Sequence, residues 1–342
     1  MRFLSALLFL ALTAARLAAQ NFAADLTTTV QNLEKTKAAA IAGSDGWLFF
    51  GGELRLLSLG QFWGDAATKV SRAHKPDLAD PLPAILDFHQ QLKARGIELL
   101  IVPVPPKAAV YPEKIVAGVD PRTTDPAPVL HRFYDKLRAA GVDVLDLSTL
   151  FVQNRENARG PVFCKTDSHW SGIGCVLASE AIAEKVRAKI AKPGGAKEYV
   201  AEWKEAEREG DLASLVAGDG RKLPPEKIAV QSVSEKGTGA PVQDDPNSPL
   251  LLLGDSHTLI YHDRDFLPVN AGLVDQLALQ LGFAPDLIGT SGSGATPVRI
   301  NLYRRSVKDP GYLAKKKMIV WCFAAREFTE ATEGWAKVPV AK

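Results

Sequence analysis

The sequence predicts an α/β domain in three layers, a sandwich in which helices cover both faces of a mostly parallel central sheet. One observation is a unit of amphipathic helix, glycine and apolar strand that occurs twice, at 81–104 and 127–147. Another is a pair of unbroken apolar runs at 250–253 and 318–323, which lack the alternation of strands with one solvated face. Strands buried on both faces have this composition, and they form parallel sheets that helices cover.

The individual elements follow from the spacing of apolar residues and from the glycines that end the helices. In chain order we expect a helix at 25–40, a strand at 47–50, a helix from 81 to Gly96, a strand at 97–104, a helix at 127–140, a strand at 142–147, a helix at 173–189, a strand at 250–253, a helix at 273–282, a strand at 286–288, a helix at 297–305 and a strand at 318–323. Residues 193–219 lack core periodicity and are expected to form an insertion or a surface helix. Residues 234–248 are expected to form a loop.

The first 19 residues have the layout of a secretory signal peptide. Arg2 precedes an apolar run at 3–15, and small residues at 17–19 favour cleavage after Ala19. The run is shorter than the roughly 20 apolar residues of a spanning helix. An uncleaved signal anchor is the alternative, and either one places the rest of the chain outside the cytoplasm. The expected organisation is a signal segment at 1–19, an N-terminal helical segment at 20–42 and one domain at 43–342.

Charge and cysteine content restrict the possible partners and cross-links. The 41 basic and 39 acidic residues give a formal net charge of +2 and are scattered along the chain, which argues against nucleic acid as a partner. Cys164 and Cys175 are two of three cysteines, and an oxidising compartment permits a bridge between them. Small buried thiols are an equal alternative.

The apolar run at 250–253 leads directly into Gly254, Asp255 and Ser256. A side chain at the carboxyl end of a parallel strand lies where open α/β sheets bind their ligands. Gly254 permits a tight turn, and the N–H groups that follow can stabilise an oxyanion. Ser256 is therefore a candidate nucleophile, although the same tripeptide is also an ordinary entrance to a turn.

Asp167 and His169 stand just before the helix predicted at 173–189. On an extended backbone, side chains two positions apart point to the same side. The Asp167 carboxylate can then orient the His169 imidazole while the other ring nitrogen faces a serine. The alternative is a helix N-terminus that uses Asp and Ser as capping residues, with an incidental histidine.

Ser256 needs an adjacent base, because a serine hydroxyl is a poor nucleophile without one. The chain has six histidines. Five are less suited: His89 and His131 fall in predicted helices, His74 in a polar loop, His257 beside the serine on a diverging course, and His262 without an accompanying Asp-x-His pattern. His169 is the strongest candidate for the base.

The order of these motifs resembles the periplasmic alginate O-acetyltransferase family, whose catalytic domain is a rearranged SGNH-hydrolase fold. Asp-Ser-His-Trp at 167–170 precedes Gly-Asp-Ser at 254–256, whereas ordinary SGNH hydrolases place Asp-x-x-His after the serine. The segments 45–49, 103–112 and 320–326 also agree with the family. The similarity extends over nearly all of the chain after the signal segment, and the order of the blocks carries most of its weight.

The resemblance implies an acetyltransferase that moves an acetyl group onto a hydroxyl of an exported polysaccharide through an acetyl-enzyme intermediate. It assigns Ser256 as nucleophile, His169 as base and Asp167 as orienting carboxylate. No metal or organic cofactor is needed. A periplasmic location and a membrane-bound partner that hands over acetyl groups are also implied. Two alternatives stay open: a carbohydrate acetylesterase with the same residues, and a catalytically silent carbohydrate-binding or assembly protein.

The asparagine oxyanion donor of the SGNH pattern has no identifiable position here. The glycine-rich turn at 289–294 opens the helix predicted at 297–305, and its N–H groups, including those of Gly292 and Gly294, can face an oxyanion. A flexible helix entrance is the alternative interpretation.

Three further residues are candidates for substrate binding. Arg299 can hold an acidic sugar, although surface arginines on helices are common. Arg326 is similar to an arginine of the family, and the alternative is a solvated residue just past the last strand. Trp170 can stack on a sugar ring, although a core position is slightly favoured.

Overall fold

The computed structural model describes residues 21–193, 197–216 and 223–342. The predicted signal segment at 1–19 lies outside these ranges. Within them, every helix is too short or too polar to cross a membrane. Residues 21–36 are helical, so the helix expected at 25–40 is present but ends earlier than predicted, and Ala40 already belongs to a strand.

Five parallel strands form the central sheet, in the order β4, β3, β9, β7, β8. They are β3 Glu98–Val104, β4 Asp143–Val144, β7 Leu250–Gly254, β8 Asp286–Gly289 and β9 Met318–Ala324. Every residue of β7 and β9 is buried, which explains their unbroken apolar sequences. The expected strand at 142–147 is shorter than predicted, because only Asp143 and Val144 pair with β3.

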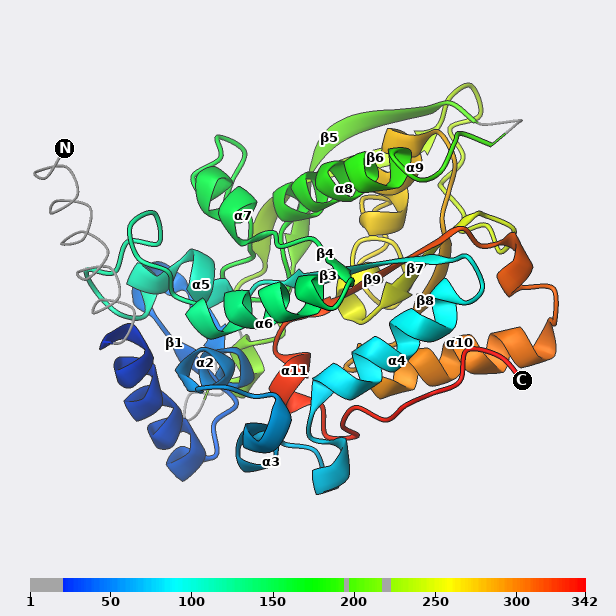
Figure 1. Ribbon diagram of the computed structural model, residues 1–342. Coiled ribbons are helices and arrows are strands. Elements are labelled where there is room, and N and C mark those ends of the chain that lie inside the picture. The colour runs from blue at the N-terminus through cyan, green and yellow to red at the C-terminus, as the bar shows by residue number, and fades with distance from the viewer. Residues whose placement is uncertain (1–20, 194–196, 217–222) are drawn as a thin grey trace, which may run out of the picture.

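Helices cover both faces of this sheet, so the predicted three-layer α/β architecture is confirmed. Figure 1 shows α8 (Gly172–Arg187) and α9 (Leu273–Leu281) above the sheet, and α4 (Pro81–Lys93) and α10 (Thr296–Lys308) below it. The buried face of α4 packs on β9, where the Phe88 ring meets Trp321 edge-on at 5.2 Å. The helix α6 (Pro128–Ala139) connects β3 to β4.

Smaller elements surround the carboxyl edge of the sheet. Near the N-terminus, β1 and β2 form an antiparallel pair. The remaining bounds are β1 Ala40–Ala42, β2 Leu48–Phe50, α2 Gly51–Ser58, α3 Ala67–Val70, α5 Lys107–Val110, α7 Ser148–Asn154 and α11 Glu327–Glu330.

The surface helix offered for 193–219 is wrong, because this region contributes one strand of a long hairpin. β5 (Tyr199–Arg208) pairs antiparallel with β6 (Glu226–Glu235) along all ten residues. Partly buried residues recur in β5 at spacings of four, three and two, so burial along most of this strand does not alternate. Pairing with β6, whose Ile228 and Val230 are buried, decides the conformation instead. The loop expected at 234–248 is largely irregular.

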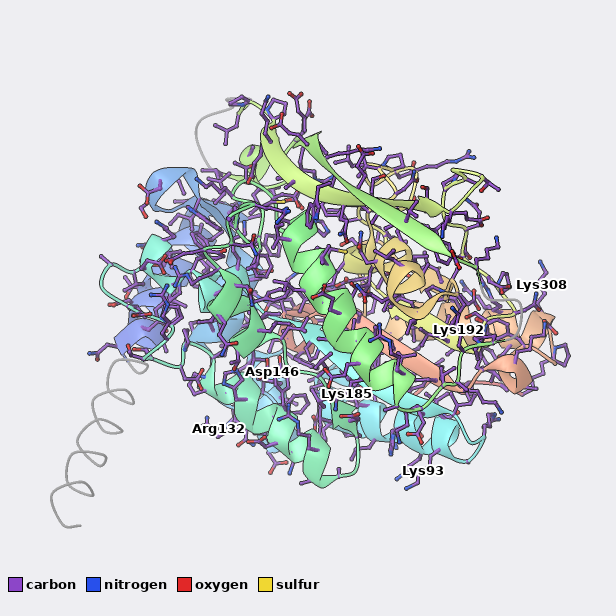
Figure 2. The ribbon with its side chains drawn as sticks, turned by 90° about the horizontal axis from the view of Figure 1, so that it is seen from above. Lys93, Arg132, Asp146, Lys185, Lys192 and Lys308 are labelled. Carbon is purple, nitrogen blue, oxygen red and sulfur yellow. The ribbon has the colours of Figure 1, made fainter. Side chains whose placement is uncertain are left out.

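Three helices carry a lysine at the end that lies opposite to the Ser256 edge of the sheet. Lys93, Lys185 and Lys308 lie in the last turns of α4, α8 and α10, and all three are exposed (Figure 2). A positive charge in the last turn of a helix opposes the negative end of the helix dipole. Helix stability therefore accounts for much of this distribution.

Gly254 ends β7 at a point where the chain passes close to β9. A Cβ atom at this position would lie 1.8 Å from the Cys322 carbonyl oxygen and 2.6 Å from Cγ2 of Thr258. Only glycine therefore fits between β9 and the turn that carries Ser256.

Gly254→Ala is expected to destabilise the protein by roughly 3 kcal/mol, the upper end of the usual cost of overpacking, as measured by urea unfolding. Gly60→Ala is the matched control, since a Cβ atom at Gly60 meets nothing within 4 Å. The control should lose no stability. A Gly254→Ala protein as stable as the wild type would contradict this account of the strand end.

Candidate active site

Ser256 opens a single 3-10 turn, Ser256–Thr258, directly after β7. The Asp255 side chain fixes this turn, because it accepts hydrogen bonds from the backbone N–H of His257 (2.9 Å) and of Ala324 (2.7 Å). The second bond joins the turn to the end of β9. Ser256 is thus presented at the carboxyl edge of the sheet by two neighbouring strands, as the position of its motif predicts.

The structure brings Ser256, His169 and Asp167 together in one hydrogen-bonded row. His169 Nε2 lies 2.7 Å from Ser256 Oγ, and His169 Nδ1 lies 2.6 Å from Asp167 Oδ1. A carboxylate facing Nδ1 holds the proton on that nitrogen, which leaves Nε2 free to accept the hydroxyl proton of the serine. His169 is only 5% exposed and Ser256 6%.

Asp167 is completely buried, and both of its oxygens are occupied by donors. Oδ1 also accepts from the His169 backbone N–H (2.9 Å), while Oδ2 accepts from Arg208 Nε (2.8 Å) and the Asp211 N–H (3.2 Å). Burial alone would raise the pKa of Asp167, but the interactions with His169 and Arg208 outweigh it and hold the pKa well below its usual range. The carboxylate therefore stays ionised.

The closed end of the β5–β6 hairpin, where β5 leads into β6, also holds the backbone around Asp167. The Glu226 carboxylate accepts from the N–H groups of Lys165 (2.9 Å) and Thr166 (3.1 Å). Asp211 accepts from the Ser168 N–H (2.7 Å) and hydroxyl (2.6 Å). The predicted insertion is thus part of the site's framework.

Lys107 is a fully buried cation beneath the same segment. Its Nζ donates to the carbonyl oxygens of Leu48 (2.9 Å), Lys165 (3.2 Å) and Asp167 (2.6 Å), which uses all three of its protons. Burial lowers the pKa of Lys107 and the nearby Glu53 carboxylate opposes that shift. Lys107 therefore ties the Asp167 segment to β2 and α5.

A cavity of about 230 Å³ opens in front of this row of residues. Besides Ser256 and His169, its walls include Phe50, Asp211, Leu212, Phe266, Gly292 and Arg326. Gly292 has a φ of 73°, which glycine adopts without strain. Among the described residues, neither the Ser256 N–H nor the Gly292 N–H has a hydrogen-bond acceptor.

Gly294 does not offer its N–H to this cavity. That group donates to Glu327 Oε2 (3.1 Å), and the Gly294 carbonyl accepts from Trp321 Nε1 (2.8 Å). A Cβ atom here would lie 2.4 Å from Cβ of Phe323, so close packing explains the glycine. The suggestion that Gly294 is an oxyanion donor is therefore corrected, since its N–H anchors the glycine-rich turn.

Two predicted substrate contacts prove to be core residues. Arg299 is 1% exposed and its guanidinium lies against the rings of Trp321 (5.2 Å) and Trp335 (5.8 Å), so it is not a surface arginine that meets a sugar. Trp170 is fully buried and packs edge-on against His257 at 5.2 Å, so its ring has no face for a sugar. The core alternative for Trp170 is the correct one.

Arg326 does line the cavity, and it is held there rather than solvated. Its Nη1 donates to Glu53 Oε1 (3.0 Å), and its guanidinium lies 5.2 Å from the centre of the Phe50 ring. Although burial lowers the pKa of Arg326, Glu53 and Asp255 raise it overall. The cation is therefore a permanent feature of the cavity wall.

His257 forms a second aspartate–histidine pair next to the first. Its Nδ1 lies 3.0 Å from Asp255 Oδ1, and its ring lies 4.9 Å from that of His169. Burial lowers the pKa of His257, which keeps the imidazole neutral. As expected, its side chain turns away from the serine hydroxyl.

The possible bridge between Cys164 and Cys175 is absent. Both cysteines are free and buried.

The acidic groups near the histidine could in principle hold a metal ion. Asp167, His169 and Asp211 have ligand atoms within 4.8 Å of one another. A metal ion there would displace the His169 Nδ1 proton and compete with Arg208, so this arrangement fits proton transfer better than metal binding.

The chain matches the family described as SGNH hydrolase-like domain, acetyltransferase AlgX, over residues 40–281, more than half of its length. The chain belongs to this acetyltransferase family. The match includes Asp167, His169 and Ser256 and ends before the glycine-rich turn at 289–294. The family expected from the order of the motifs is thereby confirmed, and so are the acetyltransferase class and the SGNH-like fold.

Relatives of this AlgX-type domain include two proteins named "Probable alginate O-acetylase AlgJ". The one from Pseudomonas aeruginosa is 26% identical over 313 residues, which cover 87% of this chain and 72% of the relative. The one from Pseudomonas putida is 25% identical over 299 residues, which cover 85% and 70%.

Solved structures agree on the fold of the AlgX-type domain. The "O-Acetyltransferase Domain of Pseudomonas putida AlgJ" superposes with a TM-score of 0.62 at 22% identity, over 85% of this chain and 92% of that one. Pseudomonas aeruginosa AlgX gives a TM-score of 0.57 at 19% identity, over 83% and 62%.

Several supporting residues escaped prediction from the sequence. Lys107 stood in a segment that resembles the family, but its burial is not visible in the sequence. Arg208 and Glu226 lie 41 and 59 positions after Asp167, and no local pattern links them to it. Asp255 and His257 do form an Asp-x-His pattern, which a search for that spacing would have found.

Lys107→Met is expected to lower the free energy of unfolding by about 3 kcal/mol, because it leaves three buried carbonyl oxygens without a donor. It should also slow acetyl transfer, since the Asp167 segment loses its support. Lys114→Met is the control, as Lys114 only pairs with the exposed Asp45 and should cost about 1 kcal/mol or less. Equal losses for both variants in chemical denaturation would argue against the proposed role of Lys107.

Glu327→Gln is expected to change how stability depends on pH. Burial and then repulsion from Asp255 raise the pKa of Glu327 to about 7, against the opposing effect of Arg326. A carboxyl whose pKa rises on folding stabilises the protein fully below its unfolded pKa. That stability is lost as the pH rises through the folded pKa.

From pH 4.5 to pH 8, the wild type should therefore lose about 3 kcal/mol more than Glu327→Gln, at 1.36 kcal/mol for each pKa unit. Urea unfolding at both pH values measures the difference. The exposed Glu180→Gln variant on α8 serves as the control and should follow the wild type. If Glu327→Gln shows the same slope as the wild type, the carboxyl does not titrate in this range.

Proposed function

We propose that this protein transfers acetyl groups to hydroxyls of an exported polysaccharide through an acetyl group carried on Ser256. The observation that supports this most directly is the hydrogen-bonded row of Asp167, His169 and Ser256 at the wall of a cavity. The acetyltransferase family to which the chain belongs supplies the kind of group that is moved.

The proposed reaction is a double displacement. His169 Nε2 takes the hydroxyl proton as Ser256 Oγ attacks the acetyl carbonyl, and the protonated imidazole then gives that proton to the leaving group of the donor. In the second half, an acceptor hydroxyl loses its proton to His169 and attacks the acetyl carbonyl. The Ser256 Oγ–acetyl bond breaks and the serine recovers its proton. Asp167 holds the imidazole and stabilises its positive charge, and neither half requires a metal or an organic cofactor.

The N–H groups of Ser256 and Gly292 are the proposed oxyanion donors. Both residues line the cavity, and both N–H groups lack an acceptor among the described residues. Negative charge that develops on the acetyl oxygen would meet two oriented dipoles in a site with little water. Arg326 adds a fixed positive charge to the same wall.

A polysaccharide is proposed as acceptor because the curated relatives are named alginate O-acetylases. We further propose a periplasmic location and a membrane-bound partner that delivers acetyl groups, as the family resemblance and the signal-like segment at 1–19 imply. An uncleaved anchor in that segment would keep the domain close to such a partner.

A serine-directed sulfonyl reagent tests the chemistry at Ser256. We expect covalent capture at Ser256 that disappears in Ser256→Ala and falls at least about 10³-fold in rate in His169→Ala, because the hydroxyl loses its base. His74→Ala is the matched control, since His74 is exposed and its side chain forms no hydrogen bond with any described residue. Capture is followed by mass spectrometry, and undiminished labelling in His169→Ala would overturn the proposed role of the base.

An acetyl-ester assay separates transfer from hydrolysis. Acetate release from a model ester should decrease, and acetylated sugar should appear, when an alginate oligosaccharide is added. Acetate release that is unaffected by the oligosaccharide would support an acetylesterase. Unchanged polymer acetylation in cells that carry Ser256→Ala would support a catalytically silent binding protein instead.

A further inference from the structure

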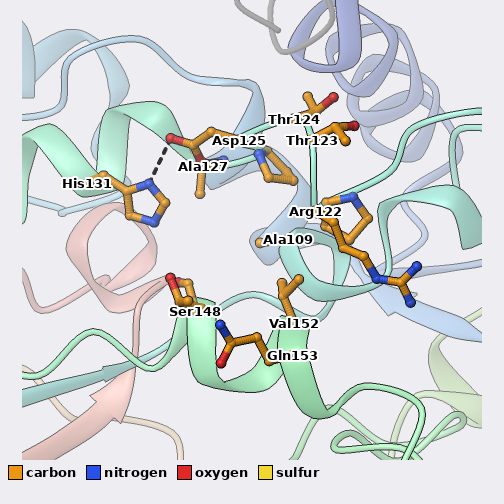
Figure 3. Close-up of a pocket in the computed structure, with 13 residues that line it drawn as sticks. Ala109, Arg122, Thr123, Thr124, Asp125, Ala127, His131, Ser148, Val152 and Gln153 are labelled. Carbon is orange, nitrogen blue, oxygen red and sulfur yellow. Dashed lines mark hydrogen bonds and ion pairs between the residues drawn. The ribbon is translucent and has the colours of Figure 1, made fainter.

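A second and larger cavity lies on the same edge of the sheet as Ser256. Its volume is about 690 Å³, within the range of roughly 300–1,000 Å³ that is usual for small-molecule sites. It is formed by α5, by the loop at 121–127, by the start of α6 and by α7 (Figure 3). Since α5 follows β3 and α7 follows β4, the cavity opens at the carboxyl ends of these strands, where open α/β sheets bind their ligands.

The walls of this cavity combine hydroxyl and amide groups with small apolar side chains. Ser148, Thr149 and Gln153 come from α7. Ser148 is half-buried, Thr149 and Gln153 are exposed at the mouth of the cavity, and the side-chain polar atoms of all three form no hydrogen bond with any described residue. Arg122 and two threonines stand on the opposite side in Figure 3. The apolar side chains that line the cavity are all small: Ala109, Pro121, Pro126, Ala127 and Val152. A sugar ring presents this same mixture of hydroxyls and C–H groups.

The shape of the cavity is set before any ligand arrives. Asp125 Oδ2 lies 2.8 Å from His131 Nδ1, and Asp125 Oδ1 accepts from the Ala127 N–H (2.9 Å), so the loop is fastened to the first turn of α6. Burial alone would lower the pKa of His131, but the carboxylates of Asp125 and, to a smaller extent, Asp146 outweigh burial, so the pKa is raised overall. His131 therefore lies between two carboxylates, at 2.8 Å from Asp125 and 3.4 Å from Asp146, which hold its ring in place on this wall.

The cavity is also connected to the proposed catalytic residues through one helical turn. Ala109 lines the cavity, while Lys107, two positions earlier in α5, donates to the Asp167 carbonyl. The helix α5 therefore contributes both to this cavity and to the support of the Asp167 segment. Both cavities lie at the carboxyl edge of the sheet.

We infer that the cavity formed by α5, α6 and α7 is a distal subsite that binds a sugar unit of the acceptor polysaccharide while another unit is acetylated at Ser256. The inference rests on the proposed function. The unpartnered groups of Ser148, Thr149 and Gln153 bind the sugar hydroxyls, and the alanine and proline surfaces meet its C–H face. Because the subsite holds the polymer and not the acetyl group, it contributes to acceptor affinity rather than to formation of the acetyl-enzyme.

Binding of a hexasaccharide prepared from alginate, measured by calorimetry without an acetyl donor, tests this subsite. Gln153→Ala should weaken binding about fivefold, as expected for the loss of one hydrogen bond. Thr149→Trp should weaken it tenfold or more, because the indole fills the cavity. Gln90→Ala is the matched control, since Gln90 is an exposed glutamine on α4, and it should bind like the wild type.

Measuring capture of Ser256 in the same variants distinguishes a wrong subsite from a wrong catalytic mechanism. Capture of Ser256 by the sulfonyl reagent should be the same in Thr149→Trp as in the wild type, while the KM for the hexasaccharide rises and kcat is unchanged. Wild-type affinity in Thr149→Trp, with capture intact, would overturn the subsite alone. A wild-type protein that binds no hexasaccharide would overturn it whatever happens at Ser256.

Discussion

The buried carboxylate of Asp167 is the constraint on which the rest of the site depends. An ionised carboxylate in a protein interior is very unfavourable unless every oxygen is matched by donors or by positive charge. Here the donors come from two parts of the chain: His169 follows Asp167 closely, whereas Arg208 and Asp211 belong to a segment about 40 residues later. Breaking any one of them would leave a buried charge without full compensation. Burial of the ionised Asp167 carboxylate therefore requires that the segments carrying its donors are folded at this edge of the sheet.

This constraint explains why the β5–β6 hairpin belongs to the site. Its strands contribute nothing to the central sheet. Its closed end, however, carries Arg208, Asp211 and Glu226, which bind the side chain of Asp167 or the backbone on either side of it. Lys107 holds the same backbone from below. The backbone around Asp167 does not pair with a strand of the central sheet, so side chains supply hydrogen bonds to its N–H and C=O groups. Buried backbone groups need such partners as much as buried side chains do.

The sequence predicts those parts of the structure that depend on local pattern. Apolar strands that end in glycine turns predict the sheet, and the spacing of Asp167 and His169 predicts that they face each other. The supporting residues depend on contacts between segments that are distant in the sequence. Arg208 is an example, because nothing in the sequence around it indicates that its partner is Asp167. The prediction that Arg299 contacts substrate was wrong because a local rule did not hold. An arginine in a polar helix is usually exposed, but here three aromatic rings surround it. Tertiary packing overrode local expectation in both cases.

The two aspartate–histidine pairs beside Ser256 show why pattern alone does not assign a base. Asp167–His169 and Asp255–His257 have the same spacing, and both histidines are buried. His257 belongs to the same tight turn as the serine, so its ring cannot come back to face the neighbouring hydroxyl, and Asp255 uses its oxygens to hold that turn. His169 arrives from another segment and meets the hydroxyl at 2.7 Å. The base therefore has to come from a part of the chain outside the turn that carries the nucleophile, and in this fold that part is the segment secured by the hairpin and Lys107.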